Sequence, residues 1–427
     1  MTAQQKKTPF DHLKAFLAVL GPGLITGAAD DDPSGISTYS VAGATTGLST
    51  LWLALISTPM MAVVQGMCAR LSLVTGQELA ALLRKQLPTW MAYALAIAVI
   101  AANTINIGAD VAGMAAAAAL FVHLPIWALS VAFGLVTLAM QILLSYAKMS
   151  RVIKWLTLTL FAYIITAFIV HANWLDILKH LVVPEIRFDA NWFAVAVGLL
   201  GTTITPYLFF WQSALEIEEA KEHGERTVKQ RRGTNEKQLA DAHADVNAGM
   251  IFSNVVAVFI IITTASTLGG HATHIASAQQ AAEALRPLAG DFAYALFALG
   301  MVGTGLLAIP ALSGSSAYLA AGTFQFREGL NEPPRRARKF YAVLAGGVVI
   351  GIALDFLGVN PIDALFWSAI VNGIAAVPLI AAIVWLASNR KVMGRWVSSP
   401  LARFWGWLCV ALMAMAAIAF IVTSFHH

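Results

Sequence analysis

Three consecutive aspartates interrupt a long apolar stretch near the start of the chain. Asp30, Asp31 and Asp32 lie within residues 14–43 and are followed directly by Pro33. Charges at membrane depth are costly, and irregular backbone there is tolerated only where it lines a cavity. We therefore expect a broken membrane helix that holds a cation, with Asp32 as a direct ligand and Asp30 or Asp31 facing a vestibule that attracts cations. The alternative is a kinked helix end whose acids lie in the membrane interface.

A second interruption lies in the apolar run 191–218. It contains Gly201 and Pro206, with threonines at positions 202, 203 and 205. Proline removes a backbone N–H donor and clashes with the preceding turn, so carbonyl groups before it lose their partners. These carbonyls, the threonine hydroxyls and the Asp32 carboxylate are hard oxygen ligands, which suit Mg²⁺, Ca²⁺ or Mn²⁺. The sequence therefore predicts an oxygen-lined cation site between two unwound segments.

The composition is that of an all-α polytopic membrane protein. Of the 427 residues, 58% are hydrophobic and only 12% are charged, about half the charged fraction of a soluble domain. The net charge of +4 comes from loops and does not indicate a nucleic-acid partner. No H-E-x-x-H motif or comparable catalytic pairing occurs, so we do not expect an enzyme.

Long apolar runs predict eleven membrane spans. They fall roughly at 14–43, 48–72, 89–121, 125–146, 151–171, 191–218, 242–268, 289–323, 340–357, 361–387 and 400–424. With the N-terminus in the cytoplasm, only Lys179, Arg187 and Arg286 of the chain's 27 Lys and Arg fall outside. Cytoplasmic loops are enriched in Lys and Arg, so this orientation is expected, with the C-terminus outside.

The two interruptions occupy the same place in two halves of the chain. Each lies in the first span of a set of five, within a first repeat of about 14–171 and a second of about 191–387. Paired interruptions of this kind indicate a transporter with inverted repeats and a site near the bilayer midplane. We expect a single transmembrane domain over 1–427, in which the last span, about 400–424, is an addition.

Other polar residues fall inside the predicted spans. Asn103, Asn106 and Asp110 recur at helical spacing and share one face of span three. We expect them to line a hydrated pathway; the alternative is hydrogen bonding between helices. Asn372 in span ten is expected to approach the site from the side, and packing against a neighbouring helix is its alternative.

The chain resembles the Nramp family of divalent metal transporters over nearly its whole length. The motifs that carry the resemblance occur in the family's order: Gly21-Pro22-Gly23, the Asp32-Pro33 break, Ala69-Arg70-Leu71 with Thr75-Gly76, and the Gly201…Pro206 break. The resemblance implies a LeuT-like fold of two inverted five-helix repeats, with the metal site between spans one and six.

The departures from the family pattern concern the expected ligands. Gly35 stands where the family has an asparagine ligand, and Thr205-Pro206-Tyr207 stands where it has Met-Pro-His. The soft thioether and the histidine of the family's proton pathway are therefore absent. Span three lacks the first acidic residue of the family's proton route, and Asp110 corresponds to the second. This pattern is similar to the Nramp-related magnesium transporters, a branch thought not to be proton-coupled.

The residues and the resemblance together give one functional hypothesis. We expect import of a hard divalent cation, most of all Mg²⁺ and then Mn²⁺, across a bacterial-type plasma (inner) membrane, without proton coupling. The expected metal ligands are Asp32, Thr202, Thr205 and Gly35, with Asp31, Asp30, Tyr207, Asn103, Asn106, Asp110 and Asn372 along the pathway. Beyond the transported ion and the lipid bilayer, no cofactor or obligate protein partner is expected.

Two other functions remain as alternatives. The first is proton-coupled Mn²⁺/Fe²⁺ symport of the ordinary Nramp type, with Asp30, Asp31 or Asp110 in the proton path. The second is an amino-acid carrier on the same fold. Such carriers bind the substrate carboxylate at half-helix N-termini, where an acidic triplet is unfavourable.

Overall fold

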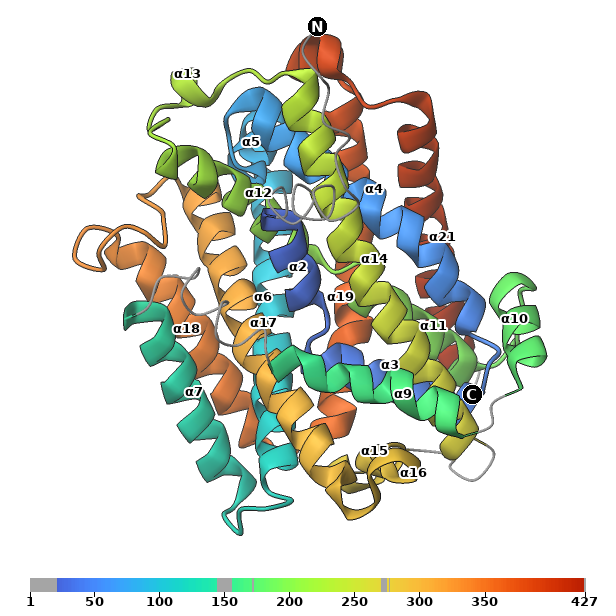
Figure 1. Ribbon diagram of the computed structural model, residues 1–427. Coiled ribbons are helices and arrows are strands. Elements are labelled where there is room, and N and C mark those ends of the chain that lie inside the picture. Colours follow the sequence, from blue (N-terminus) through green and yellow to red (C-terminus); the bar gives the residue numbers. More distant parts are fainter. Residues whose placement is uncertain (1–20, 144–155, 171–172, 270–274, 276, 426–427) are drawn as a thin grey trace, which may run out of the picture.

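The structure is a bundle of helices. The computed structural model describes residues 21–143, 156–170, 173–269, 275 and 277–425, and every regular element in these ranges is helical (Figure 1). The long uninterrupted helices are α4 (Leu51–Thr75), α6 (Thr89–Ala118), α7 (Ile126–Leu143), α14 (Glu236–Thr267), α17 (Ala293–Phe324), α18 (Arg338–Asp355), α19 (Pro361–Ser388) and α21 (Pro400–Phe425).

Two of the predicted spans are each divided into two helices. The first comprises α2 (Pro22–Asp30) and α3 (Pro33–Thr46), and the sixth comprises α11 (Ala190–Thr203) and α12 (Pro206–Glu222). Pro33 and Pro206 each begin the second helix of their pair, where a missing N–H costs nothing and the fixed φ angle favours helix. The two breaks predicted from the sequence are confirmed.

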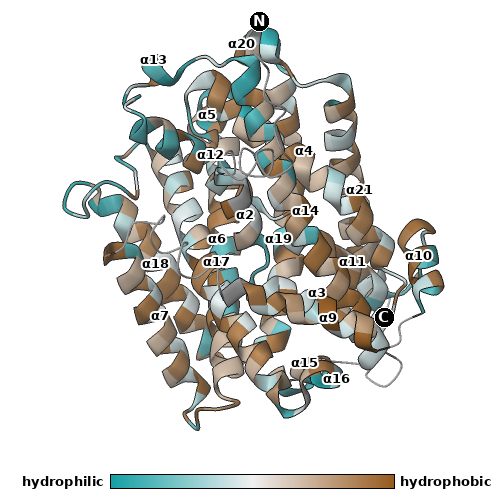
Figure 2. Cartoon of the chain, viewed as in Figure 1, coloured by the Kyte–Doolittle hydropathy of each residue, from teal (hydrophilic) through white to brown (hydrophobic). Residues whose placement is uncertain are grey.

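Most of the other predicted spans are single membrane-length helices. Among the described residues, eight segments are long and apolar enough to cross a bilayer. These eight include the divided sixth span, and the divided first span, α18 and the fifth span are the remaining three. The fifth span contains η1 (Leu156–Leu160) and α9 (Phe161–Ile169), and its first residues, 151–155, lie outside the described ranges. Figure 2 shows hydrophobic residues over most of the length of the bundle.

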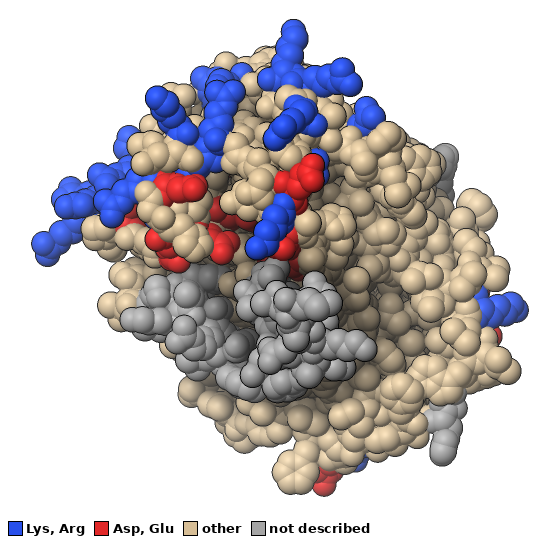
Figure 3. Space-filling view, turned by 45° about the horizontal axis from the view of Figure 1, so that its top comes forward, with Lys and Arg blue, Asp and Glu red and all other residues tan. Residues whose placement is uncertain are grey.

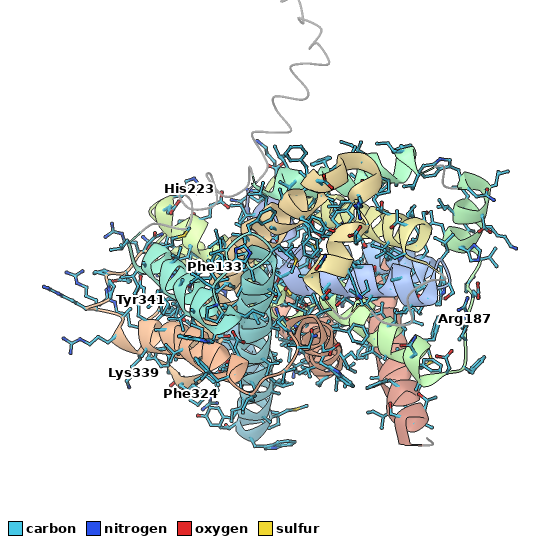
Figure 4. The ribbon with its side chains drawn as sticks, turned by 90° about the horizontal axis from the view of Figure 1, so that it is seen from below. Phe133, Arg187, His223, Phe324, Lys339 and Tyr341 are labelled. Carbon is cyan, nitrogen blue, oxygen red and sulfur yellow. The ribbon has the colours of Figure 1, made fainter. Side chains whose placement is uncertain are left out.

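Short elements cover the two ends of the bundle. They are α5 (Leu79–Gln86), α10 (Trp174–Val182), α13 (Val228–Arg231), α15 (Ala278–Glu283), α16 (Arg286–Ala289), η2 (Gly290–Phe292), α20 (Arg390–Met393) and η3 (Gly394–Trp396). Lys and Arg gather at the end that carries α5, α13 and α20 (Figures 2 and 3). Seen from below, Arg187 lies at the edge of the molecule opposite Lys339 and Tyr341 (Figure 4).

The broken spans pack against the long helices α14 and α19. α14 packs against α2, α3 and α4, while α19 packs against both α6 and α11. A Cβ atom added at Gly27 of α2 would lie 2.4 Å from the backbone of Gly249 in α14. Only glycine at 27 allows this approach, so α2 lies in direct backbone contact with α14.

A buried acidic side chain lies at the junction of α4 and α5. Glu78 is 4% exposed, and Lys221 Nζ lies 3.8 Å from its Oε1. Burial raises the pKa of Glu78 well above its ordinary value, the negative charge of Glu328 raises it further, and Lys221 lowers it. Folding therefore favours the protonated form of this side chain.

We expect Glu78→Gln to stabilise the protein at alkaline pH. Because the folded pKa is raised, the contribution of Glu78 is favourable at low pH and is lost as pH rises through the folded pKa. The variant should therefore be more stable than wild type at pH 8, by about 1 kcal/mol or more, with the difference shrinking towards pH 5. Thermal unfolding at both pH values measures this. The exposed Glu236→Gln serves as control, and an equal shift at both pH values would contradict the expectation.

Candidate metal site

Asp32 lies at the first break, immediately before α3. Its Oδ1 accepts a hydrogen bond of 2.6 Å from the Gly35 backbone N–H and so caps the N-terminus of α3. Its Oδ2 accepts a hydrogen bond of 3.0 Å from Asn106 Nδ2 of α6. The side chain is 3% exposed. The partial positive charge at a helix N-terminus stabilises a carboxylate here, which explains how the charge is tolerated at this depth.

A hydrogen-bonded network extends from Asp32 to two long helices. Asn106 Nδ2 also donates to Asp110 Oδ2 at 3.2 Å, and Asp110 Oδ1 accepts from the Ser34 N–H at 3.2 Å. On the other side, Asn372 Nδ2 of α19 donates to Asn106 Oδ1 at 3.1 Å. The structure thus brings together Asp32, Asn106, Asp110 and Asn372, all buried. Asn106 fixes the orientation of the Asp32 carboxylate.

Asn103 is directed elsewhere. Its Nδ2 donates to the hydroxyls of Ser315 and Ser316 in α17, at 3.1 and 2.9 Å. These hydrogen bonds join two helices. For Asn103 they correspond to the alternative interpretation of the polar face of span three, and not to a hydrated pathway. The structure therefore does not join Asn103 to the network around Asp32.

The second break faces the first across Gly35. A Cβ atom added at Gly35 would lie 3.3 Å from both Asp32 Oδ1 and Thr202 Oγ1. The carboxylate of one break and a hydroxyl of the other therefore both lie close to Gly35. Thr205 lies at the N-cap of α12, yet its Oγ1 makes no cap bond and is buried with no partner among the residues that the structure describes. These neutral and anionic oxygens are the donor set that a hard cation prefers.

Tyr207 connects the two breaks directly. Its hydroxyl donates a hydrogen bond of 2.7 Å to the carbonyl of Ala29, near the end of α2. This carbonyl belongs to the last turn of α2, where helix carbonyl groups have no partner within the helix. The Tyr207 hydroxyl therefore serves to hold α12 against α2.

Asp30 and Asp31 point towards α14 and share a partner there. Ser253 Oγ lies 2.5 Å from Asp30 Oδ2 and 3.1 Å from Asp31 Oδ1. Asp30 Oδ1 and Asp31 Oδ2 are buried with no hydrogen-bond partner in the described part of the chain. Among the described residues no three acidic, histidine or cysteine side chains converge to hold a metal ion. Asp30 and Asp31 therefore point to one side and Asp32 to another. Ser253 could not be singled out beforehand, because it is one serine in a long apolar helix.

Comparisons with known proteins agree with this architecture. The model of the family described as natural resistance-associated macrophage protein-like, Nramp, matches residues 23–423. The divalent metal cation transporter MntH of Acidiphilium cryptum (strain JF-5) is 29% identical over 386 residues, covering 88% of this chain and 84% of that protein. MntH of Bacillus subtilis (strain 168) is 23% identical over 418 residues, covering 96% and 93%.

Solved structures share the fold. A manganese transporter of Eremococcus coleocola, crystallised with an aromatic bis-isothiourea compound, superposes with a TM-score of 0.71 at 19% identity, covering 99% of this chain and 89% of that chain. A nucleobase-cation-symport-1 family transporter in a closed conformation gives a TM-score of 0.54 at 11% identity, covering 94% of this chain and 93% of that chain. The predicted LeuT-like, all-α fold is confirmed. Because the family model spans almost the entire sequence, the chain belongs to the Nramp family.

Proposed function

We propose that this membrane protein imports a hard divalent cation, Mg²⁺ first and Mn²⁺ next, without proton coupling. The observation that carries the proposal is the meeting of the two breaks at Gly35, where the Asp32 carboxylate and the Thr202 hydroxyl approach the same backbone position. No sulfur or imidazole group belongs to this set. Mg²⁺ dehydrates reluctantly and is commonly held by one or two carboxylates plus waters, and Asp32 offers such a carboxylate.

The remaining residues have supporting roles in this proposal. Asn106 and Asp110 hold Asp32 in orientation, and Thr205 offers a hydroxyl without a protein partner. The concentration of Lys and Arg at one end (Figure 3) supports a cytoplasmic position for that end. The ion would then enter from the end that carries α15 and α16 and leave towards α5 and α13.

A flux measurement tests the function. Purified protein in proteoliposomes should admit Mg²⁺ while an internal pH indicator stays constant. Protein-free liposomes give the background. Absence of Mg²⁺ influx, together with Mn²⁺ entry and acidification of the lumen, would overturn the proposal.

That outcome would favour proton-coupled Mn²⁺/Fe²⁺ symport. The hydrogen bonds that link Asp110 to Asp32 through Asn106 are the observation that favours this second candidate. Asp110 is fully buried and lies one hydrogen-bonded residue, Asn106, away from Asp32. A proton carried by Asp110 would be electrostatically linked to the charge at Asp32. The similar proteins named MntH are divalent metal cation transporters, which also supports this second candidate.

Placing a thioether at the second break should change metal preference. In Thr205→Met, a soft ligand replaces a hydroxyl, so Cd²⁺ and Mn²⁺ should compete with Mg²⁺ about tenfold better than in wild type, a gain of about 1.4 kcal/mol. Inhibition of Mg²⁺ influx by Cd²⁺ measures this. Thr205→Val removes the hydroxyl without adding sulfur and should not gain Cd²⁺ sensitivity. Unchanged competition in Thr205→Met would show that residue 205 does not face the ion.

A further inference from the structure

A mostly apolar cavity lies between α6, α7, α18 and α19, near the end of the bundle opposite the one where Lys and Arg gather. It has a volume of about 340 Å³. α7 and α18 lie side by side at the edge of the bundle (Figure 1). Of the described residues that line the cavity, Asp355 alone is charged. An apolar cavity with very few polar groups is typical of a ligand-binding site.

The cavity extends along the helices that form its walls. Its wall on α6 reaches from Ile105, near the middle of that helix, to Ala112, which lies closer to the helix end. This length of helix spans about 10 Å. Ile105 and Trp367 of α19 line the cavity and are exposed side chains of membrane-length helices, so the cavity opens towards lipid. A space of this shape and polarity suits an alkyl chain.

The one carboxyl group of the cavity lies at a helix end. Asp355 is the last residue of α18, and its Oδ2 is buried with no hydrogen bond in the described part of the chain. Ser130 of α7 lies close to this carboxyl group, but a single hydroxyl cannot neutralise a charge. The last carbonyl groups of a helix also carry partial negative charge. The carboxylate and the helix end therefore both favour a cation at the same place.

That cation has to come from outside the described chain. The described residues that line the cavity include no Lys, Arg or His. A metal ion is not favoured, because among the described residues no three acidic, histidine or cysteine side chains converge. An ammonium group brings one positive charge and several N–H donors, which match the Asp355 carboxylate and the Ser130 hydroxyl. At the end of a membrane helix, ammonium groups are available from phospholipid headgroups.

We propose that this cavity binds one acyl chain of a phospholipid whose ammonium headgroup pairs with Asp355. The chain lies along α6 towards Ile105, and the ammonium group lies at the end of α18. An ethanolamine headgroup supplies both the charge and the N–H donors. A glycerol headgroup supplies no positive charge, so it leaves the lipid phosphate uncompensated near Asp355. The site therefore selects ethanolamine lipid over glycerol lipid, whichever ion the protein transports.

Native mass spectrometry of the delipidated protein in detergent tests the headgroup. With equimolar palmitoyl-oleoyl phosphatidylethanolamine and phosphatidylglycerol, the first lipid adduct of wild type should contain the ethanolamine lipid at least about threefold more often, as expected of a partly exposed ion pair. Asp355→Asn should lose this preference. Asp291→Asn removes an exposed charge outside the cavity and should keep it. Equal amounts of the two lipids on wild type, or an unchanged preference in Asp355→Asn, would overturn the proposal.

A second substitution tests the position of the acyl chain. Ala364 of α19 lines the cavity and is only partly buried, so Ala364→Leu fills part of the cavity without placing a larger side chain in the closed core. Binding of the ethanolamine lipid should fall at least about threefold, because less of the chain is buried. Ala98→Leu makes the same change at an exposed position of α6 outside the cavity and should bind like wild type. Equal binding by the two variants, both shown to be folded by thermal unfolding, would overturn the site.

Discussion

Asp32→Ala is expected to lower divalent metal influx at least about 30-fold at unchanged protein level in the membrane. The carboxylate lies at the meeting point of the two breaks and accepts hydrogen bonds from Gly35 and Asn106. Removing a buried, hydrogen-bonded charge from its partner costs about 2–5 kcal/mol, and each 1.4 kcal/mol is tenfold. Initial rates of Mg²⁺ and Mn²⁺ influx into proteoliposomes measure the loss.

Two further variants separate charge from folding in this prediction. Asp32→Asn keeps an acceptor for the Gly35 N–H and removes the charge, so it should fold better than Asp32→Ala and transport as poorly. Asp291→Asn removes an exposed acidic charge and should transport like wild type. Wild-type influx in Asp32→Ala would show that the ion binds elsewhere.

Gly201→Ala is expected to destabilise the protein by about 1–3 kcal/mol, the usual cost of overpacking. The added Cβ would lie 2.2 Å from the Ala369 carbonyl oxygen and 2.4 Å from the Gly373 N atom. Both contacts are backbone of α19, so α11 and α19 must separate. Asn372 lies next to Gly373, and its bond to Asn106 should weaken as the helices move. Thermal unfolding and metal influx should both fall.

Gly346→Ala is the matched control. It makes the same chemical change inside α18, where the added Cβ meets nothing within 4 Å. Alanine is favoured over glycine in a helix, so this variant should be more stable by about 0.5–1 kcal/mol. Equal effects of the two substitutions would show that helix propensity, and not the contact with α19, decides at Gly201.

The positions of the breaks could be predicted because they depend on local chemistry. Pro33 and Pro206 each occupy the first position of a helix, where proline is favoured, and an aspartate before a proline is a good N-cap. The convergence of Asn106 and Asp110 followed from their spacing on one helix. Such features depend only on residues that are close together in the sequence, so they can be predicted from short segments of it.

Features that join distant segments could not be predicted. The direction of Asp30 and Asp31 depends on how α2 is rotated against α14, and Ser253 lies more than 220 residues away in sequence. Asn103 has the same spacing pattern as Asn106, yet it faces α17 because the helix passes between two neighbours. Asp245 accepts hydrogen bonds from the Gly21 and Gly23 N–H groups. These bonds likewise depend on the close approach of α2 to α14 at Gly27, which the hydrophobic periodicity of the sequence does not show.

The pairing of the first helix with α14 has a consequence for biosynthesis. The partners of Asp30 and Asp31 are made more than 220 residues after the aspartates themselves, and Asn106 follows Asp32 by 74 residues. Each aspartate at the centre of a membrane helix costs about 2.5–3.5 kcal/mol during insertion. Insertion of the nascent first span into the bilayer is therefore unfavourable on its own. Its hydrogen bonds to α14 can form only after most of the chain has been synthesised.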